Sequence, residues 1–131
     1  MTTSIRVEGL EELQRKLGAL AANTALVPEM GRSLERVRAP LVKYPLPPPN
    51  SRYKRTGKLG QRWTSQVNTS STSLEGIIGN NVVYARWVQD KEKQAKIHQG
   101  RWPTVQDVLQ DKTQAIITGF EKEIARLLRT P

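Results

Sequence analysis

The sequence has no cysteine and only one histidine, His98, among its 131 residues. Without cysteine, a chain forms no disulfides and offers no thiolate ligands to zinc. A single imidazole is also too few for a conventional multi-histidine metal site. We therefore expect no metal and no cofactor, and the composition fits folding in a reducing cytosol.

Long apolar runs are missing as well. No stretch approaches the ~18–20 apolar residues that a membrane-spanning helix requires, and the first ten residues, MTTSIRVEGL, lack the apolar segment of a secretory signal. We expect neither a membrane partner nor export by such a signal. Apolar residues make up 37% of the chain and charged residues 25%, as in soluble globular proteins, so we expect one domain that spans residues 1–131.

Acidic residues are absent from residues 41–66, although the whole chain carries 12 of them against 21 basic residues, for a net charge of +9. The prolines of residues 45–50, PLPPPN, favour an extended backbone, so we interpret residues 45–56 as an extended arm or long loop. A positive block of this kind attracts phosphates or an acidic protein surface, or it is a solvated loop that aids solubility. We call its basic side chains the basic arm: Lys43, Arg52, Lys54, Arg55, Lys58 and Arg62.

Two stripes of apolar residues near the N-terminus have helical spacing. Four leucines, at positions 10, 13, 17 and 20, predict an amphipathic helix over residues 9–22. The second stripe predicts a helix that starts near Pro28 and kinks or ends near residue 39, because Pro40 lies inside it. Its apolar residues are Met30, Leu34, Val37, Leu41 and Tyr44.

A third stripe predicts a long helix at the C-terminus. Thr104, followed three residues later by Asp107, resembles a capping box at the start of a helix. Apolar residues then recur at helical spacing as far as Leu127, which predicts a helix of ~25 residues. Gly119 lies inside this helix and costs it about 1 kcal/mol relative to alanine.

The middle of the chain predicts strands at residues 4–7, 62–69 and 74–79. We also expect Thr56 to cap a short helical turn that ends at Gln61. Residues 82–88 suit either a strand or a helix, and we favour a strand. The order of these elements predicts an α+β fold, in which N-terminal helices and a long C-terminal helix pack on a small antiparallel sheet that carries the extended basic loop.

Groupings of residues for catalysis are scarce. His98 lies near Lys96 and Arg101, where a histidine could act as a general base or phosphate contact in an RNA-cleaving toxin. No nucleophile–base pair and no paired carboxylates can be placed beside it from spacing, and a lone histidine in a basic loop is more often an exposed polar residue. The glycines form no phosphate-binding pattern. We therefore expect no enzymatic activity.

Each of the three tryptophans, Trp63, Trp87 and Trp102, directly follows an arginine. Such aromatic residues fill the core, anchor a protein interface, or stack on nucleic-acid bases. Trp102 is the best interface candidate because it lies where a polar loop meets the C-terminal helix. We call the residues predicted to contact a partner from this loop the loop interface: Lys91, Lys93, Lys96, Arg101 and Trp102.

Four motifs occur in a recognisable order. They are VEGLEELQRKLGAL, RTGKL, YARWVQD and HQGRWPTVQDVL, which start at residues 7, 55, 84 and 98. Together they resemble the small tail-completion, or head–tail joining, proteins of long-tailed bacteriophages and prophages, the minor tail-component family. The resemblance spans nearly the whole chain. It departs from the family where Gln89, Asp90 and Lys91 stand in place of an acidic residue and a Gly-Thr turn.

The resemblance implies a structural role without catalytic residues. It implies a homo-oligomeric ring with six-fold symmetry in the neck or tail of the virion, made in the cytoplasm of the bacterial host. Adjacent neck or tail-tube proteins would be its partners, with non-specific contact to the genomic DNA that passes through the ring. The alternative is a small basic nucleic-acid-binding module, which the charge and the arginine–tryptophan pairs favour.

Overall fold

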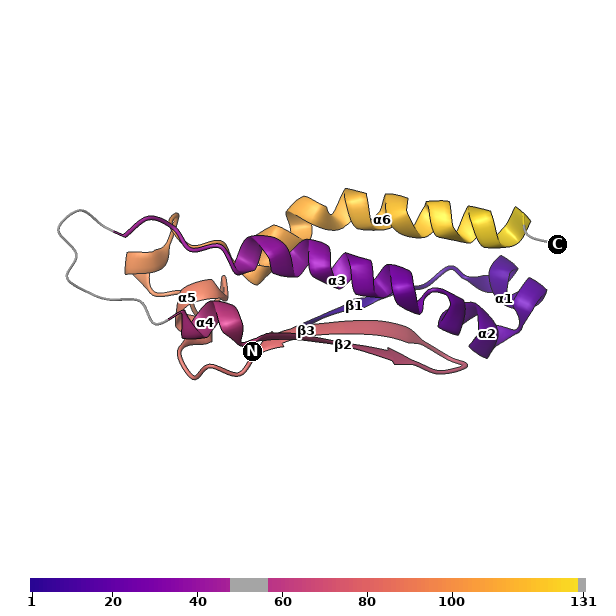
Figure 1. The fold of residues 1–131 in the computed structure, drawn as a ribbon, viewed down its shortest axis with the longest axis horizontal. Coiled ribbons are helices and arrows are strands. Elements are labelled where there is room, and N and C mark those ends of the chain that lie inside the picture. Colours follow the sequence, from indigo (N-terminus) through magenta and orange to yellow (C-terminus); the bar gives the residue numbers. More distant parts are fainter. Residues whose placement is uncertain (48–56, 130–131) are drawn as a thin grey trace.

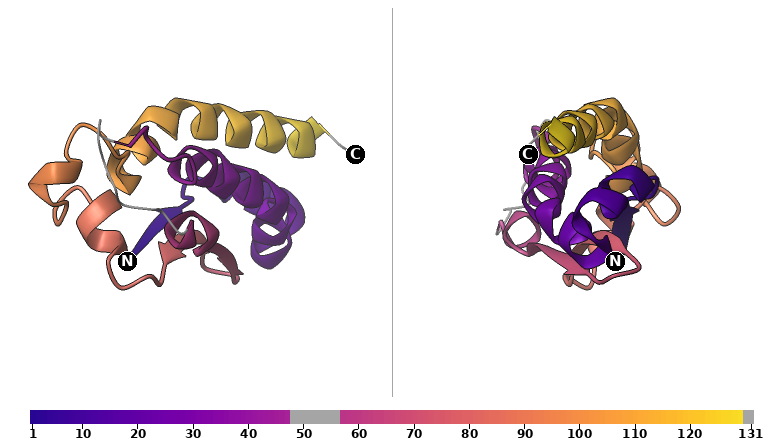
Figure 2. Two further views of the ribbon diagram at one scale, coloured as in Figure 1. Left: turned by 60° about the vertical axis from the view of Figure 1, so that its left-hand side comes forward. Right: turned by 90° about the vertical axis from the view of Figure 1, so that its right-hand side faces the viewer.

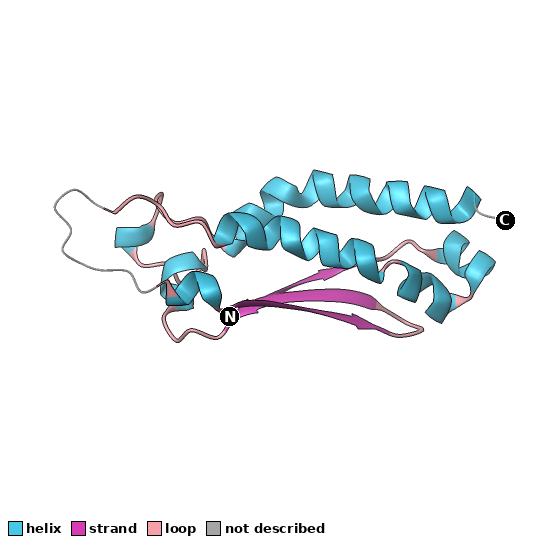
Figure 3. Ribbon diagram, viewed as in Figure 1, coloured by secondary structure: helices cyan, strands magenta, loops and turns pink. Residues whose placement is uncertain are grey.

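A three-stranded antiparallel sheet lies at the base of the structure, and helices cover one of its faces (Figures 1 and 3). The computed structural model describes residues 1–47 and 57–129. Among these residues, no helix combines the length and the apolar composition that crossing a bilayer requires. The predicted α+β class is confirmed.

The strands are β1 (Thr2–Arg6), β2 (Trp63–Thr69) and β3 (Leu74–Asn80). β3 is central and pairs antiparallel with both neighbours, so the three predicted strands are confirmed within two residues at each end. Leu74 and Ile78 of β3 are buried on the face that carries the helices. Gly76 lies between them on the same face, since side chains alternate along a strand.

Helix α3 (Val27–Leu41) packs on this face of the sheet. Pro28 occupies its first turn, where the missing N–H is no loss. Four residues of the predicted stripe are buried, since Met30, Leu34, Val37 and Leu41 are at most 1% exposed, while the fifth, Tyr44, follows the helix and is half-buried. The helix passes Pro40 and ends at Leu41, two residues later than predicted, so Pro40 marks the last turn of the helix rather than its end.

The predicted helix over residues 9–22 is wrong as a continuous helix. The chain forms two short helices instead, α1 (Glu11–Leu17) and α2 (Ala19–Ala25). Gly18 separates them with φ 89°, a conformation that glycine adopts without strain. The turn exposes Leu17 and Leu20, and it lets the buried Asn23 donate from Nδ2 to the carbonyl oxygen of Ser70, 2.6 Å away in the β2–β3 turn.

Helix α6 (Val105–Arg129) runs alongside α3 and confirms the predicted length of the C-terminal helix (Figure 2). At its start, the Asp107 N–H donates to Oγ1 of Thr104 at 3.2 Å, as the capping pattern predicts. Near its end, Lys16 Nζ donates to the carbonyl oxygens of Leu127 and Leu128, at 2.9 and 2.7 Å. This cation satisfies acceptors that a helix C-terminus leaves unpaired.

Three short helical segments complete the fold: α4 (Lys58–Gln61), α5 (Ala85–Gln89) and the 3₁₀ turn η1 (Lys96–His98). The favoured strand at residues 82–88 is therefore wrong. Ala85 and Val88 are buried at helical spacing against Leu59, in a small second core, and this packing decides between the two conformations. Gly57 occupies the N-cap position of α4 with φ 77°, whereas the predicted cap, Thr56, lies outside the described residues.

Candidate interaction surface

The segments at residues 42–47 and 57–62, which carry the described residues of the basic arm, lie with residues 81–103 at the end of the molecule opposite the C-terminus, although they are far apart in the sequence (Figure 1). Arg101 Nη2 donates to the carbonyl oxygen of Leu46 at 3.0 Å. The rings of Tyr44 and Trp102 lie 4.9 Å apart, centroid to centroid. We call this region the loop end, defined as residues 42–47, 57–62 and 81–103.

Tyr44 and Trp102 hold the loop end together. The Tyr44 hydroxyl accepts a 2.8 Å hydrogen bond from the backbone N–H of Gly60, which ties the segment after α3 to α4. Trp102 is half-buried and also meets the ring of His98 edge-on, with centroids 6.3 Å apart. Trp102 therefore packs within the loop end, while Trp63 is buried in the main core and Trp87 is 48% exposed.

Two glutamines that sequence reasoning missed organise the loop. Gln89 is fully buried, and its Nε2 donates to the carbonyl oxygens of Leu41 and Pro103, at 3.1 and 3.2 Å. Gln94 Nε2 lies within hydrogen-bond distance of the carbonyl oxygens of Val88, His98 and Trp102. Glutamine is usually exposed, so a polar run such as QDKEKQ gives no signal that its first residue is a buried anchor.

The basic residues of the two predicted groups have different surroundings. Lys91 forms a 2.8 Å ion pair with Asp107 at the start of α6, and this hydrogen bond, followed by one from Thr104, lowers the pKa of Asp107. Arg101 is half-buried through its contact with Leu46. The exposed members in the described part of the chain are Lys43, Lys58, Arg62, Lys91, Lys93 and Lys96. The remaining members of the basic arm, Arg52, Lys54 and Arg55, lie outside the described residues.

Exposed apolar side chains gather in the same region. Of the eight large apolar residues that are exposed within residues 1–47 and 57–129, five belong to the loop end: Leu46, Val83, Tyr84, Trp87 and Ile97. The guanidinium of Arg86 lies 5.6 Å from the centroid of the Trp87 ring, in a cation–π geometry. Apolar and aromatic groups with basic neighbours are typical of a protein–protein contact surface.

His98 lies inside this surface with one side of its ring buried. Its Nδ1 is buried and has no hydrogen-bond partner. Burial, and then the nearby charge of Arg101, lowers the pKa of His98 from its usual value of 6.5. In the described residues no carboxylate hydrogen-bonds to this ring and no cluster of three metal-ligating residues occurs, so nothing in these contacts favours the RNA-cleaving alternative.

Because His98 is the only histidine, its titration can be followed directly by NMR. We expect a pKa below 6.5 in the folded protein, and Arg101→Gln should raise it part of the way back. The folded state favours the neutral ring, so the free energy of unfolding should fall as the pH drops from about 6.5 to the folded pKa. A measured pKa at or above 6.5 would show that the ring is solvated and contradict the packing described above.

The chain was compared with known proteins. No family model, curated protein sequence or solved structure matches it. The resemblance to phage neck proteins therefore stays a prediction, and the function is argued from the residues and contacts of this chain.

Proposed function

We propose that this protein is a non-enzymatic structural subunit of a tailed-phage virion, in a neck or tail-completion ring that joins the tail to the head. One observation carries the proposal. The described residues of the two segments that were predicted separately to contact partners lie together in the loop end, where exposed apolar side chains stand among basic ones. The ordered motifs of the sequence point to the same class of protein.

The mixture of side chains favours a protein partner over nucleic acid. Cations alone suffice for sequence-independent binding to phosphates. The side chains of Trp87 and Ile97 are 48% and 68% exposed to solvent. Burying such apolar surface against a protein partner contributes favourable free energy of binding, because water is excluded from it. The loop end carries eight basic residues against two acidic ones, so its partner, either the next subunit or an adjacent ring, should present an acidic face.

The proposal is tested by the assembly state of the purified protein. We expect light scattering on the size-exclusion peak, with negative-stain images of the same fraction, to show a closed ring. Ile97→Asp should abolish the ring, because it places a charge in the buried centre of the contact. Leu20→Asp is the matched control, since Leu20 is also exposed (56%) but lies on α2, outside the loop end.

Two results would contradict the proposal. One is a ring that Leu20→Asp disrupts and Ile97→Asp leaves intact. The other is the absence of this chain from purified virions or tails. A monomer that binds DNA in a salt-dependent way would favour the nucleic-acid-binding module instead.

A further inference from the structure

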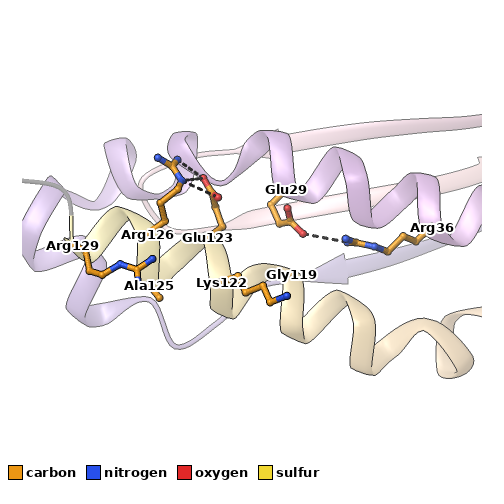
Figure 4. Close-up of a pocket in the computed structure, with 8 residues that line it drawn as sticks. All are labelled: Glu29, Arg36, Gly119, Lys122, Glu123, Ala125, Arg126 and Arg129. Carbon is orange, nitrogen blue, oxygen red and sulfur yellow. Dashed lines mark hydrogen bonds and ion pairs between the residues drawn. The ribbon is translucent and has the colours of Figure 1, made fainter.

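A second basic site lies between α3 and α6, outside the loop end. The two helices enclose an open pocket of about 510 Å³ on the surface (Figure 4). Arg36 lines it from α3, and three basic residues line it from α6: Lys122, Arg126 and Arg129. Two carboxylates also line it, Glu29 from α3 and Glu123 from α6. The sequence gives no sign of this pocket, because its cations come from two segments with little net charge of their own.

Both carboxylates are already paired. Glu29 is nearly buried, with its side chain 5% exposed, and it accepts hydrogen bonds from Arg32 at 2.7 Å and Arg36 at 3.2 Å. Glu123 is bound by Arg126, whose hydrogen bond lowers the pKa of that carboxyl group. Lys122 and Arg129 make no ion pair within the described residues, so the pocket keeps a net positive charge.

Gly119 sets the depth of the pocket. A Cβ at this position would overlap the carboxylate of Glu29 and would lie 3.2 Å from Nη1 of Arg36. The absence of a side chain therefore lets the backbone of α6 approach the Glu29–Arg36 pair closely. The buried carboxylate holds Arg36 in the lining of the pocket, where its remaining N–H groups serve as fixed donors to an anion.

The basic residues of α6 form a row. Lys122, Arg126 and Arg129 are spaced by four and three residues, so they follow one face of the helix for roughly 10 Å. On α3, Arg36 lines the pocket opposite this row. A row of cations with a further arginine on the neighbouring helix fits a linear polyanion better than a single carboxylate, and arginine forks match phosphate oxygens.

We infer that the pocket between α3 and α6 binds the phosphate groups of a nucleic-acid backbone, without sequence preference. This site is distinct from the protein-facing loop end and does not depend on the proposed function. If both hold, each subunit meets protein at one end and nucleic acid along its paired helices.

The test is binding of a labelled DNA duplex of mixed sequence, followed by fluorescence anisotropy over a range of salt concentrations. The double variant Lys122→Gln/Arg129→Gln removes two exposed cations that make no ion pair in the part of the chain that the structure describes. It should reduce the slope of log K against log[salt] by about two units, since each phosphate contact contributes about 0.9. Arg6→Gln/Lys112→Gln is the matched control, with the same change in net charge but on β1 and near the start of α6, outside both the pocket and the loop end, and it should keep the wild-type slope.

The inference is overturned if the wild type does not bind the duplex, if the pocket variant keeps the full slope, or if the control variant loses as much of the slope as the pocket variant. Binding of inorganic phosphate to the wild type, measured in parallel, distinguishes a site for small anions from a site for a nucleic-acid backbone. Phosphate that binds the wild type as tightly as the duplex does would show a small-anion site and overturn the nucleic-acid assignment. Ring formation is measured on the same samples, so failure here is distinguishable from failure of the proposed function.

Discussion

Gly76→Val is expected to destabilise the protein by about 3 kcal/mol, at the upper end of typical overpacking. Gly76 lies on the face of β3 that meets α3. A Cβ there would approach to 2.5 Å from Sδ of Met30 and 3.1 Å from Cδ1 of Leu34. Both residues are at most 1% exposed, so neither side chain has empty space to move into, and α3 must shift away from the sheet.

The measurement is the free energy of unfolding by chemical denaturation. Gly31→Ala is the control, because Gly31 lies on α3 with no atom within 4 Å of its would-be Cβ, and alanine there should stabilise the helix by up to about 1 kcal/mol. Met30→Ala in the Gly76→Val background should recover part of the loss, since it removes the clashing atoms. A Gly76→Val protein as stable as the wild type would mean that α3 does not approach the sheet this closely.

Gln89→Leu is expected to cost about 2–4 kcal/mol and to loosen the loop end. The change keeps the size of the side chain but removes the two hydrogen bonds to the carbonyl oxygens of Leu41 and Pro103. A buried acceptor left without a partner costs about 1–3 kcal/mol. Gln89 Oε1 already lacks a partner, so leucine removes one unpaired atom, which offsets a small part of the loss.

Hydrogen exchange distinguishes this effect from a general loss of stability. Amides of residues 85–103 should exchange faster in Gln89→Leu than in the wild type. The exchange of β3 amides should change only as much as the lower free energy of global unfolding requires. Gln99→Leu is the control, because Gln99 is exposed and makes only a 3.4 Å contact to the Gln94 carbonyl oxygen. Equal protection in the two variants would show that Gln89 does not hold the loop end. If the loop end is the interface, Gln89→Leu should also weaken ring formation.

Sequence reasoning was most accurate where an element follows from a local pattern. Helix α6 was predicted from its capping residues and its long apolar period, and β2 and β3 from two strands around a polar turn. It failed at Gly18, because an apolar spacing of three and four continues across a residue at which the backbone turns. It also failed at α5, where Val82–Val88 is apolar enough for either conformation and only packing against Leu59 decides.

The candidate surface could be predicted only in part. Its basic residues were visible as a charge block and as a polar loop, because charge counts need no structure. Contact between the two segments was not predictable, since it depends on Tyr44 meeting Trp102 across more than fifty intervening residues. Gln89 and Gln94 were missed because a glutamine gives the same signal in a sequence whether it is buried or solvated.

By itself, the sequence determined the α+β class, the long final helix, the lack of cysteine ligands and the excess of positive charge, because each depends on composition or on short-range period. The tertiary structure decided where that charge acts. It brought residues 42–47 and 57–62 together with the loop of residues 81–103, and it gathered cations from α3 and α6 into a pocket. It also explains Gly119. This residue lowers the stability of an isolated helix, but in the folded protein its lack of a side chain lets α6 lie close to Glu29. The physical reason is that packing and charge pairing depend on distances in space, which residue order does not specify.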